Sequence, residues 1–403
     1  MPDRDASSGN PAYRIACVLV LLGWAALFGH VLANPGAFQW DLKSYYAASH
    51  VYASGGDPYD VQNLRRVGGG ARILPFYYPL SGLHALRPIC KLDYRTAYRI
   101  WAILQAAVIA ALLLVWKRWF LERADWLWIL VLGLFGFGGA LLWDVKAGNI
   151  AAFEQLLVWA GFAFLLRSRV SAFVACVVAA SVFKMIPAVF LLLLLLPGLR
   201  SRANVLKMAI GIAAVAAIVL LPFAGKPELF ASFARGLRGA APPLEYNPTF
   251  FGAFDEMANA YGIARLGGPV KYVFLLVYAA VLLFASRRLV RAALASGSPR
   301  FAVLVAVMLY ALLMPKFVIY SYMIVFVPVL ALVFPILARS KAAVYAALAA
   351  LSLGGITAIP TSLGTFLGHW SPFLLLVGCW AVLVAAERSG ALAKVSPELC
   401  PLA

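Results

Sequence analysis

An aspartate, Asp41, follows the first long apolar run of this sequence closely enough for its carboxylate to act at the edge of that run. The run covers residues 15–33, and the stretch that follows reads Phe38-Gln39-Trp40-Asp41-Leu42-Lys43-Ser44-Tyr45-Tyr46. A carboxylate within hydrogen-bonding reach of a substrate hydroxyl can act as a general base. Asp is also a preferred residue at the start of a helix, so Asp41 can cap the helix that follows it. Both roles can hold together.

Further polar residues stand between the later apolar runs. Lysines suit the binding of a phosphate, whereas carboxylates accept protons or hold hydroxyl groups. The candidates are Tyr45, Tyr46, Asp144, Lys146, Asn149, Lys184, Glu245, Asn247, Asp255, Lys316, Tyr320, Tyr322 and His369. His369 is a lone histidine beside Trp370, and we place it only in the broad group of residues that bind or support an acceptor. The spacing of His, Asp and Glu predicts no metal site, and the five cysteines show no paired spacing. We therefore expect neither a metal nor a cofactor.

The composition is that of a multi-pass membrane protein. Of 403 residues, 64% are hydrophobic and 12% are charged, about half the charged fraction of a soluble domain. The formal net charge is +18. Its Lys and Arg residues are scattered between apolar runs, which favours contacts with anionic lipids and argues against nucleic-acid binding.

Twelve apolar runs predict an all-α bundle of about 12 spans, with 10 to 13 allowed, in a single polytopic membrane domain over residues 1–403. The runs are 15–33, 100–116, 126–142, 150–166, 170–183, 186–197, 203–222, 269–286, 301–315, 318–337, 342–359 and 370–386. The first is longer than a signal segment, so we expect it to be retained. Pro187 interrupts residues 170–197, which predicts two short re-entrant or tilted helices.

Basic residues between the runs set the orientation. Loops rich in Lys and Arg favour the cytoplasmic side, and counting through twelve spans places all of them on that side together with both termini. These residues are Lys117, Arg118, Arg167, Arg169, Arg200, Arg202, Arg287, Arg288, Arg339 and Lys341. The long segments 34–99 and 223–268 then lie on the outer face. We expect amphipathic helices on the membrane there, such as residues 41–54.

With this topology the candidate polar residues gather on the outer face. Such a gathering indicates a water-accessible cavity for a charged ligand. A ligand with a phosphate, many hydroxyls and a lipid tail suits the mixture of lysines and carboxylates, and a polyprenyl-phosphate sugar is such a ligand. The alternative is that these residues are charged only because the outer loops are exposed to solvent. Lys184 would then extend to the lipid headgroups, and the aromatic residues would be interface anchors.

Four short elements carry most of the candidate residues. The first is the Asp41 stretch with its Tyr45-Tyr46 pair, continuing to Gly55-Gly56-Asp57-Pro58-Tyr59. The others are Ala147-Gly148-Asn149, Phe183-Lys184-Met185-Ile186-Pro187, and Met314-Pro315-Lys316 with Tyr320-Ser321-Tyr322-Met323. Together they resemble glycosyltransferase family 87 of the GT-C superfamily, which includes mycobacterial polyprenyl-phosphomannose-dependent mannosyltransferases. They occur in the family's order from about residue 38 to residue 335. The second lacks the family's Gln, and Tyr246-Asn247-Pro248-Thr249-Phe250 matches the family's Asn-x-Ser element only loosely.

The resemblance implies an inverting transfer of a sugar from a polyprenyl-phosphate donor to an envelope lipid or glycan. The sugar would be mannose, another hexose or arabinose. The enzyme would be a monomer in the bacterial inner membrane, with its active site facing the periplasm. Asp41 would be the general base. The residues expected to bind the phosphate or sugar of the donor are Lys184, Lys316, Lys146, Asn149, Tyr45, Tyr46, Tyr320 and Tyr322. The residues expected to bind the acceptor, or to support the residues that contact the substrates, are Asp144, Glu245, Asn247, Asp255 and His369.

Two other functions fit a chain with twelve spans. A transporter or lipid flippase is the first, although no internal repeat is visible and the charges gather at one face rather than at mid-depth. A structural subunit of an envelope complex is the second, and it would tolerate the loss of both Asp41 and Lys184.

Overall fold

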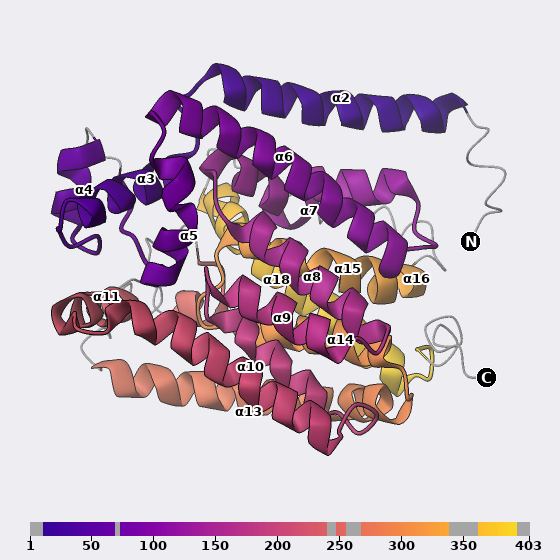
Figure 1. The fold of residues 1–403 in the computed structure, drawn as a ribbon. Coiled ribbons are helices and arrows are strands. Elements are labelled where there is room, and N and C mark those ends of the chain that lie inside the picture. Colours follow the sequence, from indigo (N-terminus) through magenta and orange to yellow (C-terminus); the bar gives the residue numbers. More distant parts are fainter. Residues whose placement is uncertain (1–10, 69–72, 240–246, 255–266, 338–361, 393–403) are drawn as a thin grey trace. The chain divides into compact units, whose positions relative to one another are not determined.

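The computed structural model describes residues 11–68, 73–239, 247–254, 267–337 and 362–392, and its secondary structure within those ranges is helical (Figure 1). The chain divides into two compact units. One unit comprises Leu22–Trp116 and Trp143–Ala241, and we call it the Asp41 unit. The other comprises Met1–Leu21, Lys117–Leu142 and Pro242–Ala403, and we call it the Lys316 unit. Each unit joins segments that are far apart in the sequence.

The helices coincide with the predicted apolar runs wherever the chain is described, which confirms the all-helical prediction there. Among the described residues, seven helices are long and apolar enough to cross a membrane. Four shorter apolar helices, Ala151–Leu166, Val170–Ser181, Ile186–Leu195 and Pro299–Leu313, match further predicted runs. The run 342–359 lies outside the described residues. The total of twelve spans remains a prediction.

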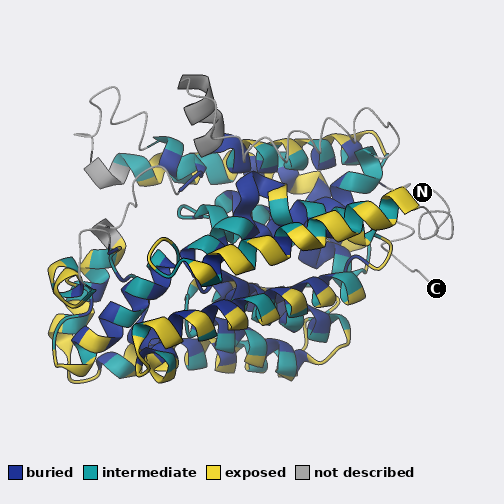
Figure 2. Ribbon diagram, turned by 90° about the horizontal axis from the view of Figure 1, so that it is seen from above, coloured by how far each residue is buried: buried dark blue, intermediate teal, exposed yellow. Residues whose placement is uncertain are grey.

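Three of the long helices have mostly exposed apolar surfaces. They are α2 (Pro11–Ala33), α10 (Arg202–Leu220) and α13 (Gly267–Ala295). Leu19 of α2 is 62% exposed, and Leu276 of α13 is 69% exposed. Figure 2 shows exposed residues along the length of α2, which leads from the N label. Apolar surface on this scale requires an apolar solvent, so these helices face lipid.

The first long loop of the sequence is largely helical in the Asp41 unit. It contains α3 (Trp40–Ala53), α4 (Val61–Gly68) and α5 (Leu80–Cys90), and α3 packs against both of the others (Figure 1). The remaining elements of the unit are α6 (Tyr94–Trp119), α8 (Ala151–Leu166), α9 (Val170–Ser181), η1 (Ile186–Leu195), α10, η2 (Leu221–Phe223) and α11 (Pro227–Gly239).

Helix α3 differs from the predicted amphipathic surface helix. It buries polar residues, including Asp41, Ser44 and Ser49, together with its apolar ones. Ser44 Oγ donates to the carbonyl of Trp40 and accepts from the backbone N–H of Leu74, which ties α3 to the loop before α5. A helix that buries its polar side chains serves as a scaffold for a site, because buried polar groups need partners inside the protein.

The predicted break near Pro187 is present. Helix α9 ends at Ser181, a turn follows, and the chain continues as the 3₁₀ helix η1, with Pro187 near its start. These two short helices contact each other and both contact α10. A 3₁₀ helix of 10 residues is long for this geometry. Lys184 therefore lies at the turn of a short helical hairpin, as the sequence predicts.

The Lys316 unit is built around α13, α14 (Pro299–Leu313), η5 (Ile319–Val325), α15 (Phe326–Pro328), η6 (Val329–Val333), α16 (Phe334–Leu337) and α18 (Ser362–Arg388). Helix α7 (Trp126–Ala147) begins in this unit and ends in the Asp41 unit. It is broken within the predicted span 126–142, because Phe137, Gly138 and Gly139 have φ of 50°, 71° and 74°. The left-handed backbone explains the two glycines.

Candidate functional site

Asn149 joins three parts of the Asp41 unit through its side chain. Its amide nitrogen lies 2.6 Å from Oδ2 of Asp41 and 3.1 Å from the hydroxyls of both Tyr45 and Tyr78. Its Oδ1 accepts from the backbone N–H of Ala151, 2.9 Å away, at the start of α8. Asn149 is fully buried. A buried amide whose nitrogen and oxygen are both engaged holds its neighbours in one arrangement.

Helix α6 holds the loop that carries Asn149. Trp101 donates from Nε1 to the carbonyl of Gly148 at 2.9 Å. The amide of Gln105 donates to the carbonyls of Asp144 and Asn149, at 3.2 and 3.0 Å. Gly148 and Asn149 follow the end of α7, whereas Asp144 lies in its last turn and its carbonyl also accepts from the backbone N–H of Asn149. Backbone carbonyls at a helix end need such donors when they are buried. The position of Asn149 is therefore set by two side chains that lie more than 40 residues before it in the sequence.

Gly148 lets this loop approach the start of α3. Its φ is +66°, and an added Cβ would lie 2.7 Å from Cβ of Gln39. The backbone N–H of Gln39, which is itself left-handed with φ of 57°, donates to the carbonyl of Lys146 at 2.6 Å. The conformation and the close contact both require glycine. This contact brings Asn149 within hydrogen-bonding distance of Asp41.

Gly148→Ala is expected to lower the free energy of unfolding by about 2 kcal/mol or more, because it adds a left-handed non-glycine residue and a steric clash. Thermal unfolding of the purified protein in detergent would show this as a lower melting temperature. Gly29→Ala is the matched control, since no atom lies within 4 Å of a Cβ there. An equal melting temperature for Gly148→Ala and the wild type would contradict the close approach.

Aromatic side chains enclose the Asp41 network. Asp41 is 6% exposed and Tyr45 is 2% exposed. The Tyr45 ring lies edge-on to Tyr78, with ring centroids 5.2 Å apart, and the hydroxyl of Tyr45 donates to that of Tyr78 at 2.9 Å. Burial raises the pKa of Tyr78, so its phenol stays neutral. Asp41 thus accepts a hydrogen bond from the neutral amide of Asn149 among aromatic side chains, and the buried Asp144 interacts with it electrostatically.

Lys184 pairs with a buried glutamate that was not among the predicted site residues. Its Nζ lies 2.9 Å from Oε2 of Glu154 on α8, and the two side chains are 18% and 6% exposed. Burial alone would lower the pKa of Lys184, but the nearby carboxylate of Glu154 outweighs it and holds the pKa above its usual range. The turn itself is fixed to α5, because Ser81 donates to the carbonyl of Val182 at 2.9 Å.

Two buried polar side chains beside this network have unused hydrogen-bonding atoms. Gln39 and Asp144 are both fully buried. Within the described part of the chain, the amide of Gln39 makes no hydrogen bond, and the carboxylate of Asp144 has only the backbone N–H of Ala152 near it, without good hydrogen-bond geometry. Asp144 interacts electrostatically with Lys184, Asp41 and Glu154. Unsatisfied buried groups next to a cluster of charges are typical of a site that binds something polar.

Asn149→Asp is expected to reduce activity by about 100-fold, because a small displacement of a reacting group has an effect of that size. The substitution removes the amide donor and places a second carboxylate next to Asp41, so the two must share a proton. Initial rates of sugar transfer would measure the loss. Asn204→Asp, on α10 and outside this network, should keep normal activity. Equal rates in the two variants would show that Asn149 does not position Asp41.

Two other predicted residues of the Asp41 unit lie in different surroundings. The hydroxyl of Tyr46 donates to the carbonyl of Leu92 at 2.9 Å, and its ring packs on Tyr94. Tyr46 therefore stabilises the end of the first long loop near Leu92, whereas Tyr45 belongs to the hydrogen-bonded network around Asn149. Lys146 is partly buried, and its Nζ lies 5.7 Å from the centre of the Trp143 ring.

In the Lys316 unit, Asn247 holds the chain on both sides of Lys316. Its Nδ2 donates to the carbonyl of Pro315 at 3.2 Å, and its Oδ1 accepts from the backbone N–H of Phe317 at 2.7 Å. Thr249 also donates to the carbonyl of Pro315. The Asn247 amide is thus engaged by the backbone and is not free for an acceptor. Its two hydrogen bonds hold the backbone in place on both sides of Lys316.

The remaining predicted residues have different positions. Tyr322 is fully buried, and its hydroxyl bonds to the carbonyl of Pro248, so it is part of the core. Tyr320 and Lys316 are partly buried. Glu245 and Asp255 lie outside the described residues, and the side chain of His369 is likewise not described.

Four polar residues in or beside the network were not predicted from the sequence: Gln39, Tyr78, Gln105 and Glu154. Glu154 and Gln105 had a visible signal, because each is a polar residue inside an apolar run, where such residues are costly and usually functional. Tyr78 and Gln39 had no signal of this kind.

The sequence model of glycosyltransferase family 87 matches residues 76–315 of the chain. No curated protein matches the sequence. The matched range includes Tyr78, Asn149, Glu154 and Lys184. It begins after Asp41 and ends just before Lys316.

Proposed function

The chain belongs to glycosyltransferase family 87 and is a membrane glycosyltransferase, and we propose that it takes its sugar from a polyprenyl-phosphate donor. The acceptor is an envelope lipid or glycan at the outer face of the bacterial inner membrane. The sugar is a hexose such as mannose, or arabinose, and transfer inverts the anomeric configuration. Family membership favours this function over the transporter and the structural subunit.

We propose that Asp41 is the general base. The acceptor hydroxyl gives its proton to the carboxylate as its oxygen bonds to the anomeric carbon of the sugar. The bond from that carbon to the phosphate oxygen breaks, and polyprenyl phosphate leaves with the electron pair. The main support for this proposal is the hydrogen bond of 2.6 Å from Nδ2 of Asn149 to Oδ2 of Asp41. It holds Oδ2 in place and thereby orients the carboxylate for proton transfer. Asp41 is only 6% exposed, so we propose that acceptor binding displaces the side chains that cover it.

We propose that Lys184 binds the donor phosphate, supported by Lys146 or Lys316. Charge-assisted hydrogen bonds to phosphate are strong, and a lysine at the turn of a hairpin can present its ammonium to a ligand. The pair with Glu154 supports the role, since Glu154 holds the ammonium in place. The buried amide of Gln39 and the carboxylate of Asp144 would then be available for sugar hydroxyls or for the acceptor.

The donor class can be tested with the purified protein in detergent. A labelled hexose is supplied either as its polyprenyl-phosphate ester or as a nucleotide sugar, together with a lipid extract as the source of acceptors. We expect labelled glycoside only from the lipid-linked donor. Transfer from the nucleotide sugar at a comparable rate would overturn the proposed donor and leave the family assignment intact.

A further inference from the structure

A groove between α13 and α18 in the Lys316 unit is lined by none of the site residues discussed above. It has a volume of about 590 Å³ and is lined by Ala285 together with Trp380, Val384, Arg388 and neighbours on α18. A second hollow of about 260 Å³ is lined by Ala285, Arg287, Arg288 and Arg388. The two share Ala285 and Arg388, so they adjoin. One end of this groove is apolar and the other end is basic.

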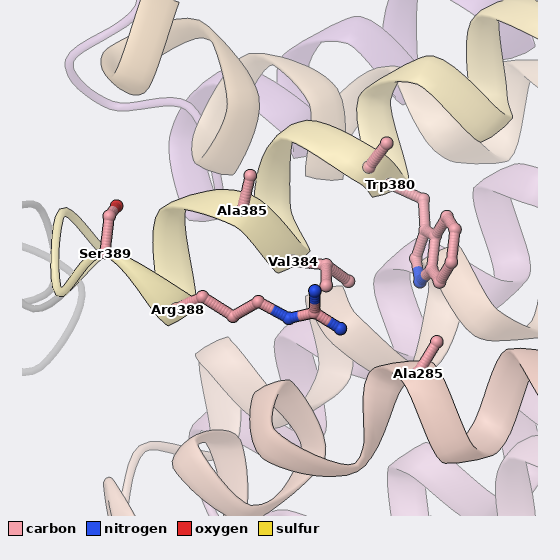
Figure 3. A pocket seen from close by; sticks show the side chains of 7 residues that line it. Ala285, Trp380, Val384, Ala385, Arg388 and Ser389 are labelled. Atoms are coloured by element: carbon pink, nitrogen blue, oxygen red, sulfur yellow. The ribbon is translucent and has the colours of Figure 1, made fainter.

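The basic end is lined by arginines and not by carboxylates. Among the described residues, neither hollow is lined by an Asp or a Glu, although Glu387 precedes Arg388 on α18. Within the described residues, Arg288 and Arg388 form no ion pair and no side-chain hydrogen bond, while Arg287 is turned onto Phe284 of its own helix. Figure 3 shows the side chain of Arg388 directed into the space between the two helices, beneath Val384. Guanidinium groups that converge on one groove favour an anion there.

The apolar end is suited to a lipid tail. Trp380 bonds from Nε1 to Ser286 Oγ at 2.8 Å, which ties α18 to α13, and its indole forms part of the groove wall. The surface of α13 before the arginines is apolar and exposed, with Val281 at 63% and Phe284 at 66%. Tryptophan and arginine at the end of lipid-facing helices are typical of the headgroup level of a bilayer. The groove and the exposed side of α13 together form a continuous surface that is apolar at one end and basic at the other.

We propose that this groove binds an anionic phospholipid. Its phosphate is held by Arg288 and Arg388, and an acyl chain lies against Trp380, Val384 and the exposed side of α13. Arg forms paired hydrogen bonds to phosphate, and basic pockets between membrane helices on the cytoplasmic side bind anionic headgroups. Arg287 and Arg288 are among the residues that predict the cytoplasmic side. The site is distinct from the proposed donor site, and its occupancy does not depend on catalysis.

Native mass spectrometry of the purified full-length protein tests the proposal. The delipidated protein is titrated with phosphatidylglycerol and, separately, with phosphatidylcholine carrying the same acyl chains. We expect tighter binding of phosphatidylglycerol, and a loss of about 30-fold in its affinity in Arg288→Gln/Arg388→Gln, since each arginine strengthens the attraction to an anionic lipid. Arg291→Gln is the matched control, because Arg291 is exposed on the same helix and lines neither hollow.

Equal affinities for the two lipids, or full retention of phosphatidylglycerol by the double variant, would overturn the proposal. Displacement of phosphatidylglycerol by an equal concentration of glycerol 3-phosphate would also overturn it, since the groove would then bind a free phosphate. If the double variant proves unstable, Arg288→Lys/Arg388→Lys keeps the charge. That variant is expected to retain the preference for phosphatidylglycerol, and its loss would likewise count against the site.

Discussion

Asp41→Asn is expected to lower the rate of sugar transfer by about 1000-fold without unfolding the protein. General base catalysis contributes a factor of this size. The substitution keeps the shape of the side chain, and the Asn oxygen can still accept the hydrogen bond from Nδ2 of Asn149. The loss should therefore appear in kcat, with little change in the KM for the donor. Initial rates at saturating donor, together with the melting temperature, would measure both effects.

Asp60→Asn is the control for this substitution. Asp60 also lies in the first long loop, and its carboxylate caps the backbone N–H of Gln62 at an exposed position. We expect Asp60→Asn to transfer sugar at close to the wild-type rate. If Asp41→Asn does the same, Asp41 is not the base. The capping role considered from the sequence is not present in the structure, because Gln39 is the N-cap residue of α3 and Asp41 lies within the first turn.

Lys184→Met is expected to have two effects that can be separated. It leaves Glu154 buried without its partner, which should cost about 3 kcal/mol of stability. It should also raise the KM for the donor by about 30-fold, the effect of losing a hydrogen bond to a charged group. A melting curve and a donor titration would measure the two effects independently.

The double variant Lys184→Met/Glu154→Leu distinguishes a structural lysine from a phosphate-binding one. Replacing both members of a buried pair by apolar residues is often close to neutral for stability. We expect the double variant to recover its melting temperature while its KM for the donor stays high. Lys207→Met, on α10, is the control for the loss of a lysine. Recovery of both stability and donor affinity would mean that Lys184 only neutralises Glu154.

Much of the architecture could be predicted because apolar runs between basic residues are a strong signal for membrane helices. The same reasoning predicted the break near Pro187 and the turn that carries Lys184, both of which the structure contains. The break in α7 was less accessible, because a left-handed turn at Phe137–Gly139 depends on local packing as well as on the glycines. The amphipathic character expected of α3 was wrong for a related reason, since its polar residues face a buried network.

The candidate site could be predicted in part. Asp41, Tyr45, Asn149 and Lys184 were selected from the sequence, and the structure brings the first three together in one hydrogen-bonded network. Their contact depends on Gly148 and on two anchors in α6, Trp101 and Gln105, which no local pattern connects to residue 149. Glu154 was missed because the candidates were sought in loops, whereas this residue pairs with Lys184 from inside an apolar helix.

The central claim is that the chain forms a glycoside from a lipid-linked sugar with Asp41 as the base. It is tested most directly in proteoliposomes that contain the purified protein, a labelled polyprenyl-phosphate hexose and a lipid extract. Mass spectrometry measures labelled glycoside and released polyprenyl phosphate. The wild type should form the two in equal amounts, and Asp41→Asn should form almost none of either. Movement of the labelled lipid across the bilayer without a glycoside, or equal product from both proteins, would contradict the claim.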